Sequence, residues 1–125
     1  MKTRVITELF KYVIIMENKN KEIILNYLES LDGKNYDRAE KYLHTNVKVI
    51  GPAGEGFTNP KPFLEMLSKH AGKYDIKKVF VDGNDVCVLY DFITPSVKVF
   101  MSSWYQLQKN KIHFIQTIFD SKLFV

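Results

Sequence analysis

Alternating apolar side chains run through the stretch DVCVLYDFITPSVKVFMSSWYQLQKNKIHFIQTIF, residues 85–119. Such alternation is typical of β-strands, whose successive side chains point to opposite faces of a sheet. Turn-forming residues divide the stretch into three predicted antiparallel strands, at residues 86–94, 97–108 and 112–119. A further strand at residues 76–81 is expected to pair with the first of them through the turn Asp82-Gly83-Asn84.

The first half of the chain has helical spacing instead. Apolar residues recur every three or four positions, and capping residues set the expected ends. Asn18 or Asn20 is expected to cap one helix that stops at Gly33, Asn35 to cap a second, and Asn59 with Pro60 to begin a third that stops near Gly72. The predicted elements are helices from 18 or 20 to 32, at 36–43 and from 60 towards 72, and a strand at 46–50 with Val47 and Val49 on one face.

The composition fits one folded domain. A chain of 125 residues with 46% hydrophobic and 26% charged residues needs no disulfide or metal to fold. Cys87, the only cysteine, lies in an apolar run and is interpreted as a small buried hydrophobe. The net charge of +4 comes mostly from scattered lysines, with Arg4 and Arg38 the only arginines, so we expect no nucleic-acid partner.

Metal, membrane and export signals are weak. His44, His70 and His113 lie far apart without a second ligand at metal spacing, which predicts no metal site and no cofactor. No apolar run reaches the length of a membrane span, and we expect no membrane partner. Glu8 and Lys11 interrupt the apolar segment that a signal peptide would need, so a cytoplasmic location is the default expectation.

Residues 1–17 are interpreted as an N-terminal extension, and residues 18–125 as the domain. The extension is expected to be an amphipathic helix over residues 3–16, packed on the domain or on a second subunit, with a membrane-surface helix as the weaker alternative. Met16 is an alternative start residue, and the sequence does not decide between it and Met1.

Both faces of the predicted sheet are largely apolar. One face must meet the helices, and the other carries Leu89, Ile93, Phe114 and Ile118. A large exposed apolar sheet face is unusual on a monomer. A homodimer through this outer sheet face is therefore expected.

The order of these elements resembles the nuclear transport factor 2-like superfamily, with its SnoaL-like and ketosteroid-isomerase-like proteins closest in pattern. The resemblance covers about residues 20–121 and rests on the strand series and on residues 26–67, NYLESLDGKNYDRAEKYLHTNVKVIGPAGEGFTNPKPFLEML. It implies an α+β, cone-shaped, cystatin-like fold in which three helices pack on a curved antiparallel sheet and enclose a pocket. Homodimers are common among such proteins.

The resemblance also implies where steroid-isomerase chemistry would lie. It places Tyr27 at the oxyanion-hole tyrosine, Gly51 at the general base and Ser103 near the second oxyanion-hole acid. Because the base is missing, no proton shuttle can be positioned, and we expect no steroid-isomerase activity. Ser103, His113 and Asp91 supply the residue types of a Ser-His-Asp catalytic triad. Strand alternation, however, is expected to place Asp91 and His113 on opposite faces of the sheet.

The expected function is therefore a SnoaL-like small-molecule-binding domain whose pocket takes a small, mostly apolar ligand. Alternatives are an enzyme of the cyclase, isomerase or dehydratase type acting on a small cyclic substrate, or a protein-interaction module. His113 is either a satisfied core or rim histidine or a general acid or base, and the tyrosines are either core or ligand-binding. Strand parity and the resemblance predict pocket residues Tyr27, Tyr90, Phe92, Ser103, Tyr105, His113, Ile115, Thr117 and Phe119.

Overall fold

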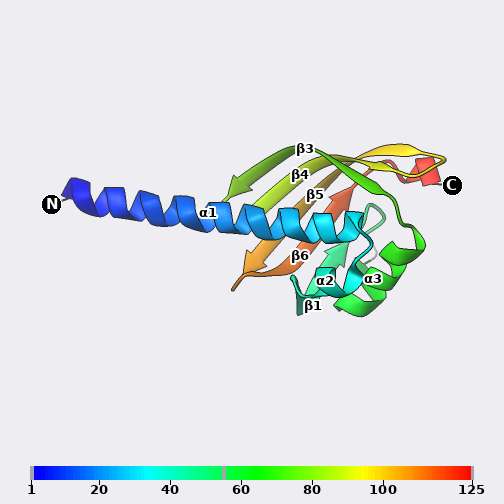
Figure 1. Ribbon diagram of the computed structural model, residues 1–125, viewed down its shortest axis with the longest axis horizontal. Helices are drawn as coiled ribbons and strands as arrows, with labels where there is room; N and C mark the ends of the chain where they lie inside the picture. Colours follow the sequence, from blue (N-terminus) through cyan, green and yellow to red (C-terminus); the bar gives the residue numbers. More distant parts are fainter. Residues whose placement is uncertain (1, 55, 125) are drawn as a thin grey trace.

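The computed structural model describes residues 2–54 and 56–124. Three helices pack on one curved six-stranded sheet, which confirms the predicted fold class (Figure 1). A short 3₁₀ helix, η1 (Ser121–Phe124), follows the sheet. The helices and strands are α1 (Lys2–Asp32), α2 (Tyr36–Glu40), β1 (Leu43–Ile50), β2 (Gly56–Phe57), α3 (Pro60–Lys69), β3 (Lys73–Asp82), β4 (Asp85–Ile93), β5 (Lys98–Gln108) and β6 (Lys111–Ile118).

The strands lie in the order β2-β1-β6-β5-β4-β3. All neighbouring pairs are antiparallel except β1 and β6, which run parallel, so the expectation of a wholly antiparallel sheet is wrong at that pair. The reason is topological: β1 enters the sheet beside the last strand, and no hairpin joins the two. In the sequence, β2 and α3 come between β1 and β3. The helix was predicted, but the short strand β2 was not.

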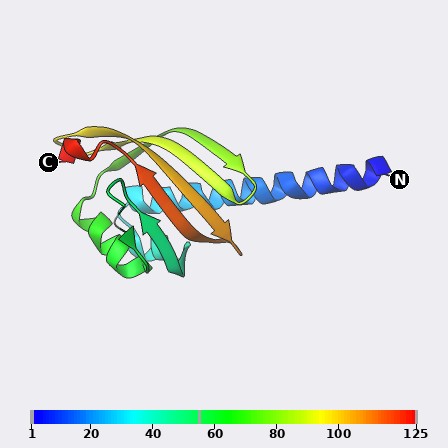
Figure 2. The same cartoon turned by 180° about the vertical axis from the view of Figure 1, so that it is seen from behind.

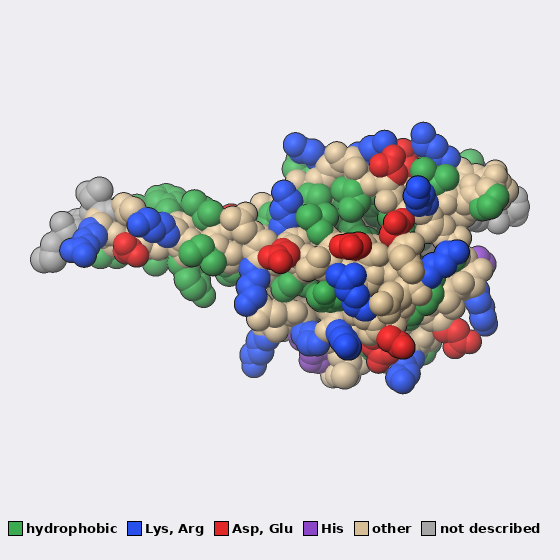
Figure 3. Space-filling view, viewed as in Figure 1, with side chains coloured by type: hydrophobic (Ala, Val, Ile, Leu, Met, Phe, Trp, Pro, Cys, Tyr) green, Lys and Arg blue, Asp and Glu red, His purple; other side chains and the backbone are tan. Residues whose placement is uncertain are grey.

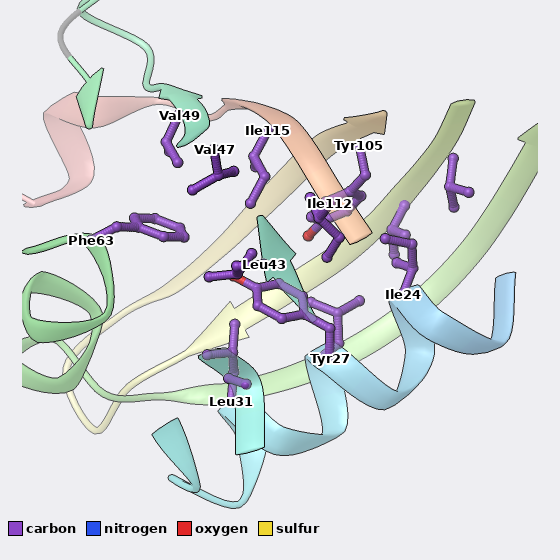
Figure 4. Packing of buried hydrophobic residues seen from close by; sticks show 14 of the residues in the cluster. Ile24, Tyr27, Leu31, Leu43, Val47, Val49, Phe63, Tyr105, Ile112 and Ile115 are labelled. Atoms are coloured by element: carbon purple, nitrogen blue, oxygen red, sulfur yellow. The ribbon is translucent and has the colours of Figure 1, made fainter. Parts of the chain in front are cut away.

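The central contact is that of α1 with the inner face of the sheet, visible from both sides of the molecule (Figures 1 and 2). Ile24, Tyr27, Leu28 and Leu31 lie on the buried side of α1 and are at most 4% exposed. The inner-facing residues of β4 include Val86 and Val88, which are fully buried. This layer is the hydrophobic core of the domain, and part of it is drawn in Figure 4.

α1 runs without a break from Lys2 to Asp32, so the helix start predicted at Asn18 or Asn20 is wrong. No glycine or proline interrupts residues 2–32, and asparagine alone does not stop a helix whose neighbours favour it. The Asn20 side chain donates a 3.0 Å hydrogen bond to the Gly83 carbonyl instead of capping α1. No helix among the described residues has both the length and the apolar composition needed to span a membrane.

The other helix and turn predictions are mostly confirmed. The Asn35 side chain accepts a 3.1 Å hydrogen bond from the Arg38 backbone N–H and caps α2, although that helix ends at Glu40 and Leu43 already belongs to β1. α3 begins at Pro60 as expected and buries Phe63 and Leu64. Positive φ angles mark the predicted hairpin turn at Gly83 and the turn at Lys109-Asn110, which lies between the strands predicted at residues 97–108 and 112–119.

Gly72 lies where the chain enters β3 and passes close to the core. A Cβ atom added there would lie 2.6 Å from the Phe92 ring and 2.8 Å from the Ile93 carbonyl oxygen. Phe92 is only 6% exposed, so an added Cβ at residue 72 would force its ring to shift within the packed core. The glycine is therefore required by close packing at this point, whereas α3 already ends at Lys69 with His70 as its C-cap.

We expect Gly72→Ala to lower the free energy of unfolding by roughly 1–3 kcal/mol, because overpacking displaces the Phe92 ring. Chemical denaturation monitored by circular dichroism measures the change. Gly33→Ala is the matched control, since its added Cβ would meet only the Glu29 carbonyl oxygen at 3.4 Å and the Ser30 carbonyl oxygen at 3.9 Å. Equal stability of the two variants would contradict the packing role of Gly72.

Candidate functional site

Six hydroxyl-bearing side chains gather between α1 and the inner face of the sheet. We call them the hydroxyl cluster: Tyr27, Tyr74, Tyr90, Ser103, Tyr105 and Thr117. The Tyr90 hydroxyl and Ser103 Oγ share a 2.8 Å hydrogen bond, and Ser103 Oγ and Thr117 Oγ1 share another of 2.8 Å. Ser103 therefore joins side chains from three neighbouring strands.

The rings of the cluster contact one another across the core. Tyr27 from α1 meets Tyr105 from β5 edge to face, with ring centroids 6.1 Å apart (Figure 4). Tyr74 from β3 lies beside Tyr90 from β4, with centroids 5.6 Å apart. Because residues 101, 103 and 105 share one face of β5, strand alternation turns Ser103 and Tyr105 inward, as the sequence predicted.

Neither Tyr27 nor Tyr74 makes a hydrogen bond through its hydroxyl to any described residue. Tyr27 is the more buried of the two, because its side chain is only 1% exposed whereas Tyr74 is half-buried. Every fully occluded polar side-chain atom among the described residues does have a partner. The Tyr27 oxygen therefore keeps a small accessible area beside it, and its donor and acceptor capacity is unused by the described chain.

Burial controls the protonation of the cluster. It raises the pKa of Tyr27 and of Tyr105 well above the ordinary value, and the neighbouring tyrosines reinforce both shifts. Burial also raises the pKa of Tyr74, and it raises that of Tyr90 to about 12 although the Ser103 and Thr117 hydroxyls act in the opposite direction. All four tyrosines are thus neutral near pH 7, and they act as hydrogen-bond donors or acceptors without charge.

The apolar residues predicted for the pocket lie in the same core. Phe92 is 6% exposed, and its ring packs edge to face on Tyr74 with centroids 5.3 Å apart. Ile115 is buried, and Phe119 is half-buried against the core cluster. Tyr74 was missed because the strand was predicted to begin at residue 76. The alternation of Tyr74 with Ile76 was the signal that could have found it.

His113 does not take the inner-facing position that strict alternation predicted, and that expectation is wrong. Gln106 pairs with Phe114 but Leu107 pairs with Ile112, so β6 carries one extra residue, a β-bulge, at His113. Ile112 faces the core in its place and is fully buried. The half-buried His113 ring stacks on the His44 ring, with centroids 4.0 Å apart. The pKa of His113 is lowered, mainly by burial and to a lesser extent by the nearby His44.

The other catalytic sets that the sequence suggested are not assembled. Asp91 lies on the outer face of the sheet, where its Oδ2 is 3.7 Å from the ammonium nitrogens of Lys77 and Lys98. Ser103 is hydrogen-bonded on the inner face, so the two residues stand on opposite sides of the sheet. Within the described residues, no group of three or more His, Cys, Asp or Glu side chains is arranged to hold a metal ion.

Comparison with known proteins gives a clear result for structure only. No protein-family model matches the chain, and no curated protein matches it. An NTF2-like protein of unknown function from Cytophaga hutchinsonii has a similar structure, with a TM-score of 0.78 and 27% identity over 82% of this chain and 91% of that one. The chain belongs to the nuclear transport factor 2-like (NTF2-like) superfamily.

Two further structures show how little this fold says about activity. A provisionally assigned SnoaL-like polyketide cyclase from Jannaschia sp. CCS1 is similar with a TM-score of 0.74 and 14% identity, covering 84% of this chain and 88% of that one. A de novo designed protein with a curved β-sheet is similar with a TM-score of 0.75 and 21% identity, covering 84% and 88%. At such identities the likeness concerns the fold, and the function must be argued from the site.

We expect Ser103→Ala to lower the free energy of unfolding by about 1–3 kcal/mol, because the buried Tyr90 hydroxyl loses the partner to which it is bonded. The double variant with Tyr90→Phe should cost less than the sum of the two single changes, since both partners are then gone. Urea denaturation of the four proteins completes the double-mutant cycle.

Ser102→Ala is the matched control for this cycle. Ser102 is the neighbouring residue on the outer face, and among the described residues the partner of its hydroxyl is the Cys87 sulfur, at 3.6 Å. Its replacement should change the free energy of unfolding by less than roughly 0.5 kcal/mol. If Ser102→Ala and Ser103→Ala were equally destabilising, the hydroxyl cluster would have no special role in stability.

Proposed function

We propose that this NTF2-like protein binds a small, flat, mostly apolar molecule bearing one or two oxygen atoms, between α1 and the inner face of the sheet. The observation that carries the proposal is the Tyr27 hydroxyl, which is nearly buried and makes no hydrogen bond to a described residue. Buried polar groups almost always have a hydrogen-bond partner, so a buried hydroxyl without one in the protein is suited to bonding a bound molecule. A ligand carbonyl or hydroxyl oxygen beside Tyr27 would provide it.

The chemistry of the surroundings supports a neutral, aromatic or alicyclic ligand. The walls are rings and aliphatic side chains, and the polar groups are hydroxyls whose raised pKa values keep them uncharged. Such pockets favour apolar molecules that are oriented by a few hydrogen bonds. A phosphate is disfavoured, because Arg4 lies on the exposed N-terminal part of α1 and Arg38 on α2.

An enzyme acting on a small cyclic substrate is the alternative, and the residues at the site favour it less. General acid–base catalysis needs a group that can exchange a proton near neutral pH. The positions matched to the family's base and second acid hold Gly51 and Ser103. The carboxylate that influences the cluster, Asp32, is exposed, and its Oδ1 accepts a 2.8 Å hydrogen bond from the Tyr74 backbone N–H.

We expect small aromatic and alicyclic carbonyl compounds to raise the melting temperature of the native chain. Tyr27→Phe should weaken binding of any such compound by about 2- to 13-fold, which corresponds to losing one neutral hydrogen bond worth roughly 0.5–1.5 kcal/mol. A thermal-shift screen followed by calorimetric titration measures both effects. Tyr12→Phe is the control, because Tyr12 is 68% exposed near the N-terminus.

Two results would contradict this proposal. One is a screen in which no compound of this class stabilises the native chain. The other is a compound that binds Tyr27→Phe as tightly as it binds the native chain. In either case the tyrosines would be core residues only, and the interaction-module function would gain support.

We also propose that the outer sheet face pairs with a second copy, as the sequence suggested. Large apolar side chains on that face support the proposal: Phe80, Phe100, Trp104 and Ile118 are 41–63% exposed. The Trp104 and Phe114 rings contact each other edge to face on this face, with ring centroids 5.0 Å apart. Homodimer interfaces have such apolar centres.

Ile118→Asp is expected to halve the particle mass measured by light scattering at micromolar concentration, because a charge would be buried in the apolar centre of the interface. Lys61→Asp on the exposed side of α3 is the control and should leave the mass unchanged. If Ile118→Asp had the same mass as the native chain, the outer face would not be the interface.

A further inference from the structure

The N-terminal part of α1 projects beyond the sheet and carries large apolar side chains (Figures 1 and 3). We call residues 4–16 the projecting segment. At 3.6 residues per turn, six of its apolar residues lie on one side of the helix. These are Val5, Ile6, Leu9, Phe10, Tyr12 and Val13, which are 40–68% exposed.

This apolar side is continuous with the side of α1 that the domain buries. Leu9, Val13 and Met16 continue in phase into Asn20, Ile24, Tyr27 and Leu31, every three or four residues. Ile24, Tyr27 and Leu31 are at most 4% exposed, whereas Leu9 is 60% exposed. The stripe therefore has one pattern along its whole length, but the sheet covers only its C-terminal half.

Contacts between α1 and the rest of the domain begin at Glu17 and Asn20, which bond to the turn between β3 and β4. Glu17 Oε2 accepts a 2.8 Å hydrogen bond from the Gly83 backbone N–H, and Asn20 donates to the Gly83 carbonyl. The turn between β3 and β4 thus holds α1 at its midpoint. On the opposite side of the projecting segment lie Arg4, Glu8 and Lys11 together with the exposed Ile15, so that side is of mixed polar and apolar character.

The exposed area is large enough to form an interface. A half-exposed aromatic side chain presents roughly 100 Å² and an aliphatic one less, so the six side chains present at most about 600 Å². Two copies would then bury at most about 1,200 Å² together, which is the lower end of the range for stable specific interfaces. An apolar area of this size is at the upper end of what a monomer exposes in one patch, and such patches often mark interaction sites.

The position of the domain restricts what can cover the stripe. The sheet lies on the same side of α1 as the stripe, because the stripe's C-terminal half is what packs on it. A flat lipid bilayer laid against residues 4–16 would overlap the sheet. A parallel second helix would bring two domains into the same space, whereas an antiparallel helix places them at opposite ends.

We propose that the projecting segments of two copies pair antiparallel through this stripe. Centring the pair on Lys11 sets Leu9 opposite Val13 of the second copy, and Ile6 opposite Met16. The segment is about 20 Å long at 1.5 Å per residue, so Val5 of each copy lies opposite Glu17 of the other, beside the turn between β3 and β4. The interface is independent of the outer sheet face and of the ligand site.

Matched charge substitutions test the stripe. Leu9→Asp should halve the particle mass measured by light scattering, because the charge would be buried between two helices. Ile15→Asp should leave the mass unchanged, since Ile15 is 67% exposed but lies on the opposite side of the helix. The proposal would be overturned if both variants had the same particle mass as the native chain. It would also be overturned if both variants lost mass to the same extent.

Cysteine cross-linking tests the direction, and it does so whether or not the outer sheet face pairs. In a Cys87→Ser background, Leu9→Cys and Val13→Cys proteins are oxidised separately and as a mixture. The mixture should form a disulfide-linked dimer joining residues 9 and 13, while each protein alone should cross-link at least tenfold more slowly. Faster cross-linking within each separate protein would show parallel pairing and overturn the antiparallel register.

The remaining alternative is a lipid surface. Sedimentation with vesicles of mixed neutral and anionic phospholipid, at the same protein concentrations, separates it from self-association. The native chain should stay in the supernatant. Vesicle binding that Leu9→Asp abolishes, with a native mass equal to that of Leu9→Asp, would overturn pairing in favour of membrane attachment.

Discussion

Burial of one side of α1 against the inner face of the sheet is the interaction on which the rest of the structure depends. It covers inner-facing residues such as Val86 and Val88, which would otherwise present a large apolar surface to water. It also sets Tyr27 opposite Tyr105, because both residues lie on the surfaces that meet. The hydroxyl cluster therefore lies inside the main packing interface, and any ligand beside Tyr27 would be a part of the core.

This placement explains the character of the site. A hydroxyl can be buried at moderate cost when it is hydrogen-bonded, as Tyr90, Ser103 and Thr117 are, whereas an unpaired carboxylate in the same place would cost far more. A core of neutral hydroxyls suits recognition of a neutral ligand. It does not suit proton transfer near pH 7, because burial moves the pKa values of the tyrosines away from that range.

Periodicity predicted the fold because most segments obey one period throughout. The alternation in β4 and β5 identified Tyr90, Ser103 and Tyr105 as inward-facing, and helical spacing identified Tyr27. It failed where a single residue changes the phase: the bulge at His113 turns the ring out of the core, and no residue type marks it in advance. The parallel pairing of β1 with β6 was also unpredictable, since alternation reports faces and not neighbours.

The N-terminal half of α1 exposes apolar side chains to water, and the domain does not cover them. A 13-residue helix is marginal in water by itself, and the projecting segment holds its helical form because the anchored half extends into it. That continuation costs nothing in nucleation, but it leaves Leu9 and Phe10 at least 60% exposed. Exposed apolar area of this size favours association in water. Since the body of the domain blocks broad flat surfaces from the stripe, a narrow partner such as an antiparallel helix fits it best.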